Sequence, residues 1–363
     1  MSVAAAPPEA RPLPQRRRWA RVVHEEIAST SYAWASLAAV VALYIANVCF
    51  QPSFVSPSNW ASILSVIAPF VIIAMAEAFP ILAGNGGLDL SLGPLMGFVT
   101  VLIAVVLVPA GISAPEFLIP VVLAIGFGAG LVNGLLVAYL RLPAIIATLG
   151  AYLFYTGFAL DLQPSPGGSV PSWLQRMSGS YGPFPAVLVP IIAIAILWVI
   201  LIHTAYRRNL LAVGGDDRAA YTAGIPVKVI RSSAYAFGGL LAAVAGLVVA
   251  GMLGGGDATV GPPYTITSIA AVALGGILLA GGRGGLLGAA AGGAIMFLIQ
   301  NLLTVANVSA FDVNIADGGL LLVALALNSF VLTGRRRRGL AGMRAVSRAD
   351  GTGGSDRGGI EGG

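Results

Sequence analysis

The sequence predicts an all-α fold, a polytopic bundle of about 10 transmembrane helices. Three observations support this fold class: few charges, many apolar stretches and a one-sided distribution of basic residues. Of the 363 residues, 57% are hydrophobic and 10% are charged, and the mean hydropathy is +0.88. A soluble domain usually carries about 25% charged residues. So few charges cannot cover a water-exposed surface, and most of the surface must therefore face lipid or other helices.

Ten apolar stretches are candidate membrane spans, because a helix needs about 20 mostly apolar residues to cross the hydrocarbon core. Glycine or proline interrupts the second, third and ninth stretches, and the eighth is short. The third begins in the polar segment Gly84-Asn85-Gly86-Gly87-Leu88-Asp89, so we expect a broken or re-entrant helix there. The ten ranges are 32–50, 61–83, 90–109, 117–139, 143–162, 185–203, 232–253, 266–281, 284–306 and 314–332.

The basic residues predict the orientation of these spans. With the N-terminus inside and the spans alternating, 19 of the 20 Lys and Arg residues fall inside, and Arg176 alone falls outside. Membrane proteins concentrate Lys and Arg on the cytoplasmic side, so we expect ten spans with both termini cytosolic. The chain then divides into a cytosolic tail (1–31), a transmembrane domain (32–333) that includes a cytosolic loop (204–231), and a basic, Gly-rich disordered tail (334–363).

Several functional classes are excluded by what the sequence lacks. The net charge of +5 does not indicate nucleic acid, because the basic residues flank apolar spans. Cys49 is the only cysteine, so neither a disulfide framework nor a cysteine metal site can form. The only lysine, Lys228, follows Val227, and a P-loop for ATP is therefore impossible. His24 and His203 lack partners at metal-ligand spacing. We expect no cofactor, no metal and no catalytic residues.

Two carboxylates lie within the apolar stretches, where ionisable side chains are costly and are functional candidates by default. Glu77 is inside the second stretch, and Asp89 is near the start of the third. Asp89 either caps the broken helix by accepting backbone N–H groups or contacts a solute or gate directly. Glu77 either makes a buried hydrogen bond or lines a pathway. Asp161 and Asp257 fall near span ends, where water is available, and are interpreted as structural.

The cytosolic loop 204–231 contains a short helix-like segment at 216–221. Asp216 is a candidate N-cap for this helix, and Gly224 and Pro226 are expected to end it. Another glycine-rich segment, 281–285, is interpreted as close packing at a tight cytosolic turn.

Five ordered groups of residues then carry a family resemblance. They are Gly86-Gly87-Leu88-Asp89-Leu90-Ser91-Leu92-Gly93; Gly130-Leu131-Val132-Asn133-Gly134-Leu135-Leu136-Val137; Leu142-Pro143-Ala144-Ile145-Ile146-Ala147-Thr148-Leu149-Gly150; Ala212-Val213-Gly214-Gly215 with Ala223-Gly224-Ile225; and Ala270-Ala271-Val272-Ala273-Leu274-Gly275-Gly276 with Ala280-Gly281-Gly282-Arg283-Gly284. The first resembles the G-G-[IL]-D-L-S-[VL]-G signature of ribose-type permeases in sugar ATP-binding-cassette (ABC) importers, and together the five span about residues 60–332. The extra pair Gly84-Asn85 departs from many sugar permeases and bears on the identity of the solute, not on the transport class.

The resemblance implies a half-transporter in the bacterial plasma (inner) membrane that moves a monosaccharide or similar small polar solute by alternating access. It implies two cytosolic ABC ATPase subunits, a periplasmic or lipid-anchored solute-binding protein, and a second permease copy or paralogue as partners in the lipid bilayer. The expected pathway or gate residues are Glu77, Asn85, Gly86, Gly87, Asp89, Ser91 and Asn133. The residues expected to couple to the ATPase are Gly214, Gly215, Asp216, Asp217, Arg218, Tyr221 and Gly224.

Two alternatives remain at the level of the sequence. The related importers of nucleosides or branched-chain amino acids share the architecture and differ in cargo. A secondary transporter driven by an ion gradient would require a dense cluster of intramembrane ion ligands, for which Glu77 and Asp89 are thin support.

Overall fold

The computed structural model describes residues 31–326, except 57, 182–183, 310–311 and 314. The predicted tails, apart from Ser31, and the end of the last predicted span lie outside the described residues. The described part is a helical bundle with one small antiparallel hairpin, β1–β2. The elements are α2 (Ser31–Phe50), η1 (Pro52–Val55), α3 (Trp60–Leu82), α4 (Leu92–Val101), η2 (Leu102–Leu107), α5 (Pro115–Ala138), α6 (Ala144–Leu162), α7 (Ser172–Met177), β1 (Ser180–Tyr181), β2 (Phe184–Pro185), α8 (Leu188–His203), α9 (Ala205–Gly215), α10 (Asp217–Thr222), α11 (Val227–Leu253), α12 (Pro263–Leu274) and α13 (Leu286–Val305). A further apolar helix is Ile315–Ala326.

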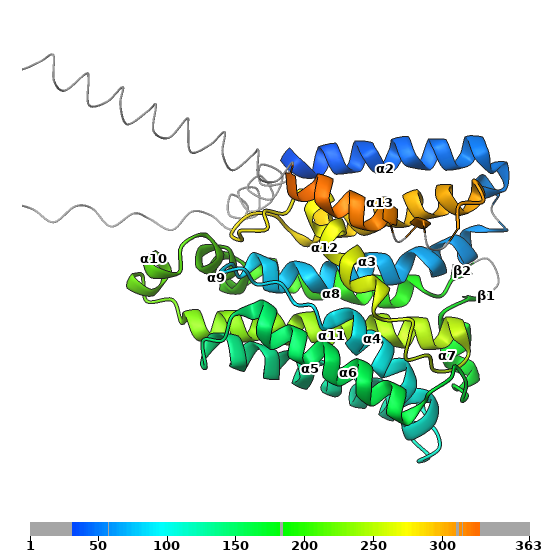
Figure 1. The fold of residues 1–363 in the computed structure, drawn as a ribbon, viewed down its shortest axis with the longest axis horizontal. Helices are drawn as coiled ribbons and strands as arrows, with labels where there is room; N and C mark the ends of the chain where they lie inside the picture. The colour runs from blue at the N-terminus through cyan, green and yellow to red at the C-terminus, as the bar shows by residue number, and fades with distance from the viewer. Residues whose placement is uncertain (1–30, 57, 182–183, 310–311, 314, 327–363) are drawn as a thin grey trace, which may run out of the picture.

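The helices form three groups side by side (Figure 1). Helices α2 and α13 lie along one side, α5 and α6 lie along the opposite side, and α3 and α11 run between them. The most apolar windows of α3 and α11 are 67% and 72% buried, whereas that of α6 is 22% buried. The core therefore forms around α3 and α11, and most of α6 is left to face lipid or another chain. Helices α9 and α10 lie at one end of the bundle, and α7 with the hairpin lies at the other.

Within the described residues, each of the ten predicted stretches overlaps a helix, the tenth as far as Ala326, but their number as membrane spans stays a prediction. Five described helices, α3, α5, α6, α11 and α13, are long and apolar enough to cross a membrane. A sixth span results if α8 and α9, which are bent by 79° at their junction, are counted as one. The remaining apolar helices are shorter: Trp34–Phe50, Leu92–Leu107, Pro263–Leu274 and Ile315–Ala326.

Two of the shorter helices differ from the predicted ranges for identifiable reasons. The third stretch is broken, as expected: residues 83–91 are not helical, and α4 begins at Leu92. The eighth was predicted at 266–281, but α12 runs from Pro263 to Leu274 and is followed by Gly275 and Gly276. Gly276 has a φ of 78°, a left-handed conformation that ends a helix.

Candidate functional site

The connection between α3 and α4 reverses the chain direction over a few residues. Gly84, Asn85 and Gly86 have φ angles of 72°, 58° and 66°. This left-handed region is open to glycine and is visited by asparagine more readily than by most residues. Three such residues in succession turn the chain back toward the interior, so that residues 83–91 form a re-entrant loop, called the inner loop below.

The inner loop carries Asp89 into a buried polar cluster. Asp89 Oδ1 accepts hydrogen bonds from the Ser91 N–H at 3.0 Å and the Ser91 hydroxyl at 2.6 Å. Asn133 Nδ2 donates to Ser91 Oγ at 2.8 Å and to both Asp89 carboxylate oxygens at 3.4 Å. The Asp89 N–H donates to Glu77 Oε1 at 3.1 Å. All four residues are 1% exposed or less, and the cluster therefore unites four predicted pathway residues.

The remaining predicted pathway residues lie beside this cluster on the same loop. Asn85 and Gly86 are exposed. Gly87 is buried, and a Cβ there would collide with the Pro80 carbonyl oxygen, so the loop lies directly on the last turn of α3. The Thr148 hydroxyl donates to the Leu88 carbonyl at 3.4 Å, which links the loop to α6. Thr148 was not among the predicted site residues.

Asn133 reaches the cluster because α5 packs closely on α11. A Cβ at Gly134 would lie 2.5 Å from the Ser232 carbonyl oxygen, and a Cβ at Gly130 would collide with the Tyr235 carbonyl. Glycines one turn apart on a helix face allow two backbones to approach in this way. The segment 130–137, which carries part of the family resemblance, therefore also sets the close contact between α5 and α11.

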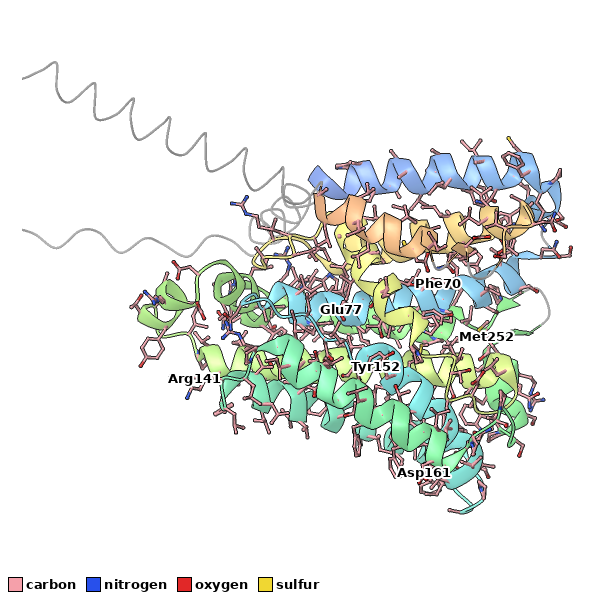
Figure 2. The ribbon with its side chains drawn as sticks, viewed as in Figure 1. Phe70, Glu77, Arg141, Tyr152, Asp161 and Met252 are labelled. Atoms are coloured by element: carbon pink, nitrogen blue, oxygen red, sulfur yellow. The ribbon has the colours of Figure 1, made fainter. Side chains whose placement is uncertain are left out.

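Two buried polar atoms near the cluster have no hydrogen-bond partner among the described residues, namely Glu77 Oε2 and the Tyr235 hydroxyl. Both residues are 0% exposed, and Figure 2 shows Glu77 in the interior of the bundle. Buried polar groups are nearly always paired with protein, water or ligand. The cluster therefore has hydrogen-bonding capacity beyond what the fold itself uses, which a hydroxyl group, an ion or water can take up.

The predicted coupling helix is present at the end of the bundle that also carries α9. Asp216 Oδ1 accepts hydrogen bonds from the N–H groups of Arg218 and Ala219, both at 3.0 Å. Asp216 is therefore the N-cap of α10, as the sequence predicts. The helix ends at Thr222, and Gly224 follows with a φ of 79°.

Helix α10 is tied to the bundle and also projects from it. Asp217 forms an ion pair with Arg231 at the start of α11, with an N–O distance of 3.1 Å. The Tyr221 side chain is 75% exposed. Helix α10 therefore combines a fixed base with an exposed surface that is available to another protein.

The end of α9 meets the inner loop through backbone contacts. A Cβ at Gly84 would lie 2.6 Å from the Gly214 carbonyl oxygen. A Cβ at Gly214 would collide with the Leu82 carbonyl and lie 2.5 Å from Gly282 N. The Gly282 N–H donates to the Leu82 carbonyl at 3.2 Å, and a Cβ at Gly282 would lie 2.5 Å from Gly215 N. The glycine-rich segment 281–285 is thus part of a close backbone junction with the inner loop and the coupling segment.

A cavity of about 1530 Å³ opens beside this junction. Figure 2 places Arg141, one of its lining residues, near the end of the bundle that carries α10. The cavity is lined both by pathway residues of the inner loop and by coupling residues. These lining residues are Asn85, Gly86, Asp217, Arg218, Tyr221 and Gly224. The two predicted sets of site residues therefore share one cavity.

A second irregular loop, residues 254–262 between α11 and α12, is called the outer loop below. Asp257 in this loop was interpreted as structural because it falls near a span end. Its carboxylate accepts hydrogen bonds from the Thr259 N–H and hydroxyl, both at 2.7 Å. These bonds repeat those between Asp89 and Ser91. The spacing of Gly, Asp and Ser/Thr in 86–93 recurs in 254–261.

The described residues form a bundle of apolar helices with a buried polar break and a capped, exposed helix at one end, an arrangement that fits a transport permease. The chain belongs to the family described as "Branched-chain amino acid transport system / permease component", whose profile matches residues 59–333. It is a permease component of an ABC importer and not an enzyme. The predicted family resemblance is confirmed.

Curated relatives are similar over most of the chain. The ribose import permease protein RbsC of Bacillus subtilis (strain 168) is 34% identical over 284 residues, which cover 77% of this chain and 87% of the relative. The galactose/methyl galactoside import permease protein MglC of Salmonella typhimurium is 31% identical, covering 80% of this chain and 92% of the relative. The autoinducer 2 import system permease protein LsrC of Escherichia coli O9:H4 is 31% identical, covering 81% and 85%. No solved structure matches.

Proposed function

We propose that this permease moves a monosaccharide or similar small polar solute across the bacterial inner membrane by alternating access. The inner loop and Asn133 form the gate on the ATPase side of the pathway, and α9 and α10 transmit the movement of the ATPase to it. The observation that carries this proposal is the backbone junction of Gly84, Gly214 and Gly282. At this junction no side chain separates the coupling segment from the gate.

The geometry supports transmission through a rigid path. The exposed Tyr221 surface of α10 is the part of the coupling segment that an ATPase can contact. The Asp216 cap and the Asp217–Arg231 ion pair hold α10 as a fixed unit. A displacement of this unit must shift Gly214, and with it the inner loop, because close-packed backbones cannot be compressed.

The cargo is proposed from the relatives. Those reported above are named as importers of ribose, galactose or methyl galactoside, and autoinducer 2. The cluster of Asp89, Ser91 and Asn133, with the free Glu77 Oε2, suits hydroxyl groups, which both donate and accept hydrogen bonds. The cluster therefore favours a polyhydroxylated solute over an amino acid, and the cargo named for the relatives favours a sugar over a nucleoside.

The assembly follows from the same proposal. Two ABC ATPase subunits bind at the α9–α10 end, which is cytosolic together with both termini, and the membrane domain crosses the bilayer ten times. A periplasmic or lipid-anchored solute-binding protein delivers cargo at the opposite end. A second permease copy or paralogue completes the pathway, and the exposed apolar surface of α6 is available for it or for lipid.

The cargo is tested by uptake into proteoliposomes that contain the permease with its co-purified ATPase and binding protein. We expect ATP-dependent uptake of radiolabelled ribose or galactose and none of leucine or adenosine. Uptake of leucine or adenosine without uptake of either sugar would contradict this proposal and indicate that the chain is a permease of the related amino-acid or nucleoside importers.

A further inference from the structure

The inner and outer loops are two copies of one local structure. The sequences Gly86-Gly87-Leu88-Asp89-Leu90-Ser91-Leu92-Gly93 and Gly254-Gly255-Gly256-Asp257-Ala258-Thr259-Val260-Gly261 share the pattern G-G-x-D-x-[ST]-x-G. The first glycine of each copy is left-handed, with φ angles of 66° and 69°. In each copy the aspartate Oδ1 accepts both the N–H and the hydroxyl of the residue two positions later.

The helices around the loops follow the same scheme with opposite direction. Each loop follows a long buried helix, α3 or α11, and leads into a short half-helix, α4 or α12. The inner loop starts at the α9 end, where Gly84 contacts Gly214. The outer loop starts at the α7 end, where a Cβ at Gly251 would lie 2.5 Å from the Leu174 carbonyl of α7. The two loops therefore enter the bundle from opposite ends, as in an inverted repeat.

The two loops meet where the half-helices begin. A Cβ at Gly93 would lie 2.6 Å from the Gly261 carbonyl oxygen, and a Cβ at Gly261 would collide with the Gly93 carbonyl. This contact is reciprocal, with the last glycine of each copy packed on that of the other. Backbone contact at this point means that neither loop can move far without displacing the other.

Threonines of the half-helices reinforce the contact in both directions. Thr265 on α12 donates its hydroxyl hydrogen to the Leu90 carbonyl of the inner loop at 3.2 Å. Thr100 on α4 accepts the Asp257 N–H of the outer loop at 3.1 Å. Each loop is thus held by the half-helix that follows the other.

The two copies differ in exposure. Asp89 and Ser91 are each 1% exposed, whereas Asp257 is half-buried and Thr259 is exposed. In transporters built from inverted repeats, alternating access is largely a rocking or gating of one repeat against the other. We propose that the outer loop is a second gate of the translocation pathway, with Asp257 and Thr259 as its positioning residues, and that it moves in opposition to the inner loop. This inference rests on the proposed function, since it requires the inner loop to be a gate.

The test compares equivalent positions of the two copies by cysteine labelling. In a Cys49→Ser background, Ser91→Cys and Thr259→Cys each introduce one nearly isosteric thiol. The complex with its co-purified ATPase is placed in nanodiscs and labelled with a membrane-impermeant maleimide, with and without trapping by ATP and vanadate. We expect trapping to raise the labelling rate at position 91 and to lower it at position 259, each by at least about fivefold, the lower end typical of coupled sites.

The outcomes separate the inference from the proposed function. A response at position 91 with no change, or a change of the same sign, at position 259 would overturn the second gate and leave the inner gate standing. No response at either position in a trapped complex would overturn both. If Ser91→Cys fails to assemble, Asn85→Cys reports on the inner loop from its exposed side.

A second pair of variants tests the link between the loops. Thr265→Val removes the hydroxyl that bonds to the inner loop while keeping the size of the side chain, and Thr265→Ser keeps the hydroxyl. We expect Thr265→Val to reduce the response at position 259 while the response at position 91 persists, and Thr265→Ser to restore it. Equal responses in both variants would contradict the mechanical link.

Discussion

The contact between Gly214 and the inner loop can be broken by a single methyl group. A Cβ at Gly214 would collide with the Leu82 carbonyl and lie 2.5 Å from Gly282 N, whereas ordinary contact begins at 3.4 Å. The junction must therefore open by more than about 0.9 Å, because the Leu82 carbonyl is closer still and both neighbours are backbone atoms that cannot rotate away. Overpacking of this kind lowers the free energy of unfolding by about 1–3 kcal/mol. The better helix propensity of alanine offsets up to about 1 kcal/mol of this loss.

The effect on transport should be separable from the effect on stability. In Gly214→Ala we expect the number of solute molecules imported per ATP hydrolysed to fall by at least about fivefold, as when two coupled sites are separated. Hydrolysis itself should continue, because the ATPase active sites lie on another chain. The assay measures sugar uptake and phosphate release in the same proteoliposomes, with thermal unfolding of the purified complex measured alongside.

The neighbouring glycine provides a matched control. Gly215 belongs to the same turn of α9, and a Cβ there would meet nothing within 4 Å. Although Gly215 is among the expected coupling residues, Gly215→Ala adds no atom to the junction and should therefore keep the wild-type ratio of uptake to hydrolysis. If both variants keep that ratio, or both lose it equally, the junction does not transmit the movement of the ATPase.

Further predictions concern the polar cluster and the coupling helix. Asp89→Asn keeps an oxygen that accepts the Ser91 bonds and should unfold near the wild-type temperature. Asp89→Ala leaves the buried N–H and hydroxyl donors of Ser91 without their acceptor, at about 1–3 kcal/mol per group, and should unfold at a clearly lower temperature in nanodiscs. Glu77→Gln keeps an acceptor for the Asp89 N–H, so we expect unchanged unfolding but slower uptake; wild-type uptake would contradict a pathway role. Asp216→Ala removes the α10 cap, a local cost of about 1 kcal/mol, and combined with Asp217→Ala it should leave folding intact while uncoupling uptake from hydrolysis. Normal ATP-driven uptake by this double variant would count against the coupling role.

The fold class and the broken third stretch could be predicted because their causes are local. The length of an apolar stretch identifies a helix. The left-handed backbone at Gly84 and Gly86 is expected because glycine adopts positive φ angles readily. The N-cap of Asp216 was predictable for the same reason, since a cap bonds to residues two and three positions away. The end of α12 was misplaced by several residues, because the apolar pattern continues through Gly275 and Gly276 although the backbone does not.

Long-range contacts could not be predicted from one sequence. A glycine in the sequence indicates that another backbone can approach closely, but it does not identify that backbone. The contact between Gly84 and Gly214, which are 130 residues apart, was therefore visible only in the structure. The repeated motif around Asp257 was missed because Asp257 was interpreted only by its distance from a span end. Comparing the two aspartate segments with each other would have revealed the repeat.

The central claim is that ATP hydrolysis on partner chains drives solute through this permease. The most direct measurement is gentle extraction from the native membrane, identification of co-purifying chains by mass spectrometry, and uptake by the reconstituted complex. The account predicts an ATPase subunit in comparable amount and uptake that requires ATP. A chain that purifies alone and takes up solute under an ion gradient, without ATP, would contradict it.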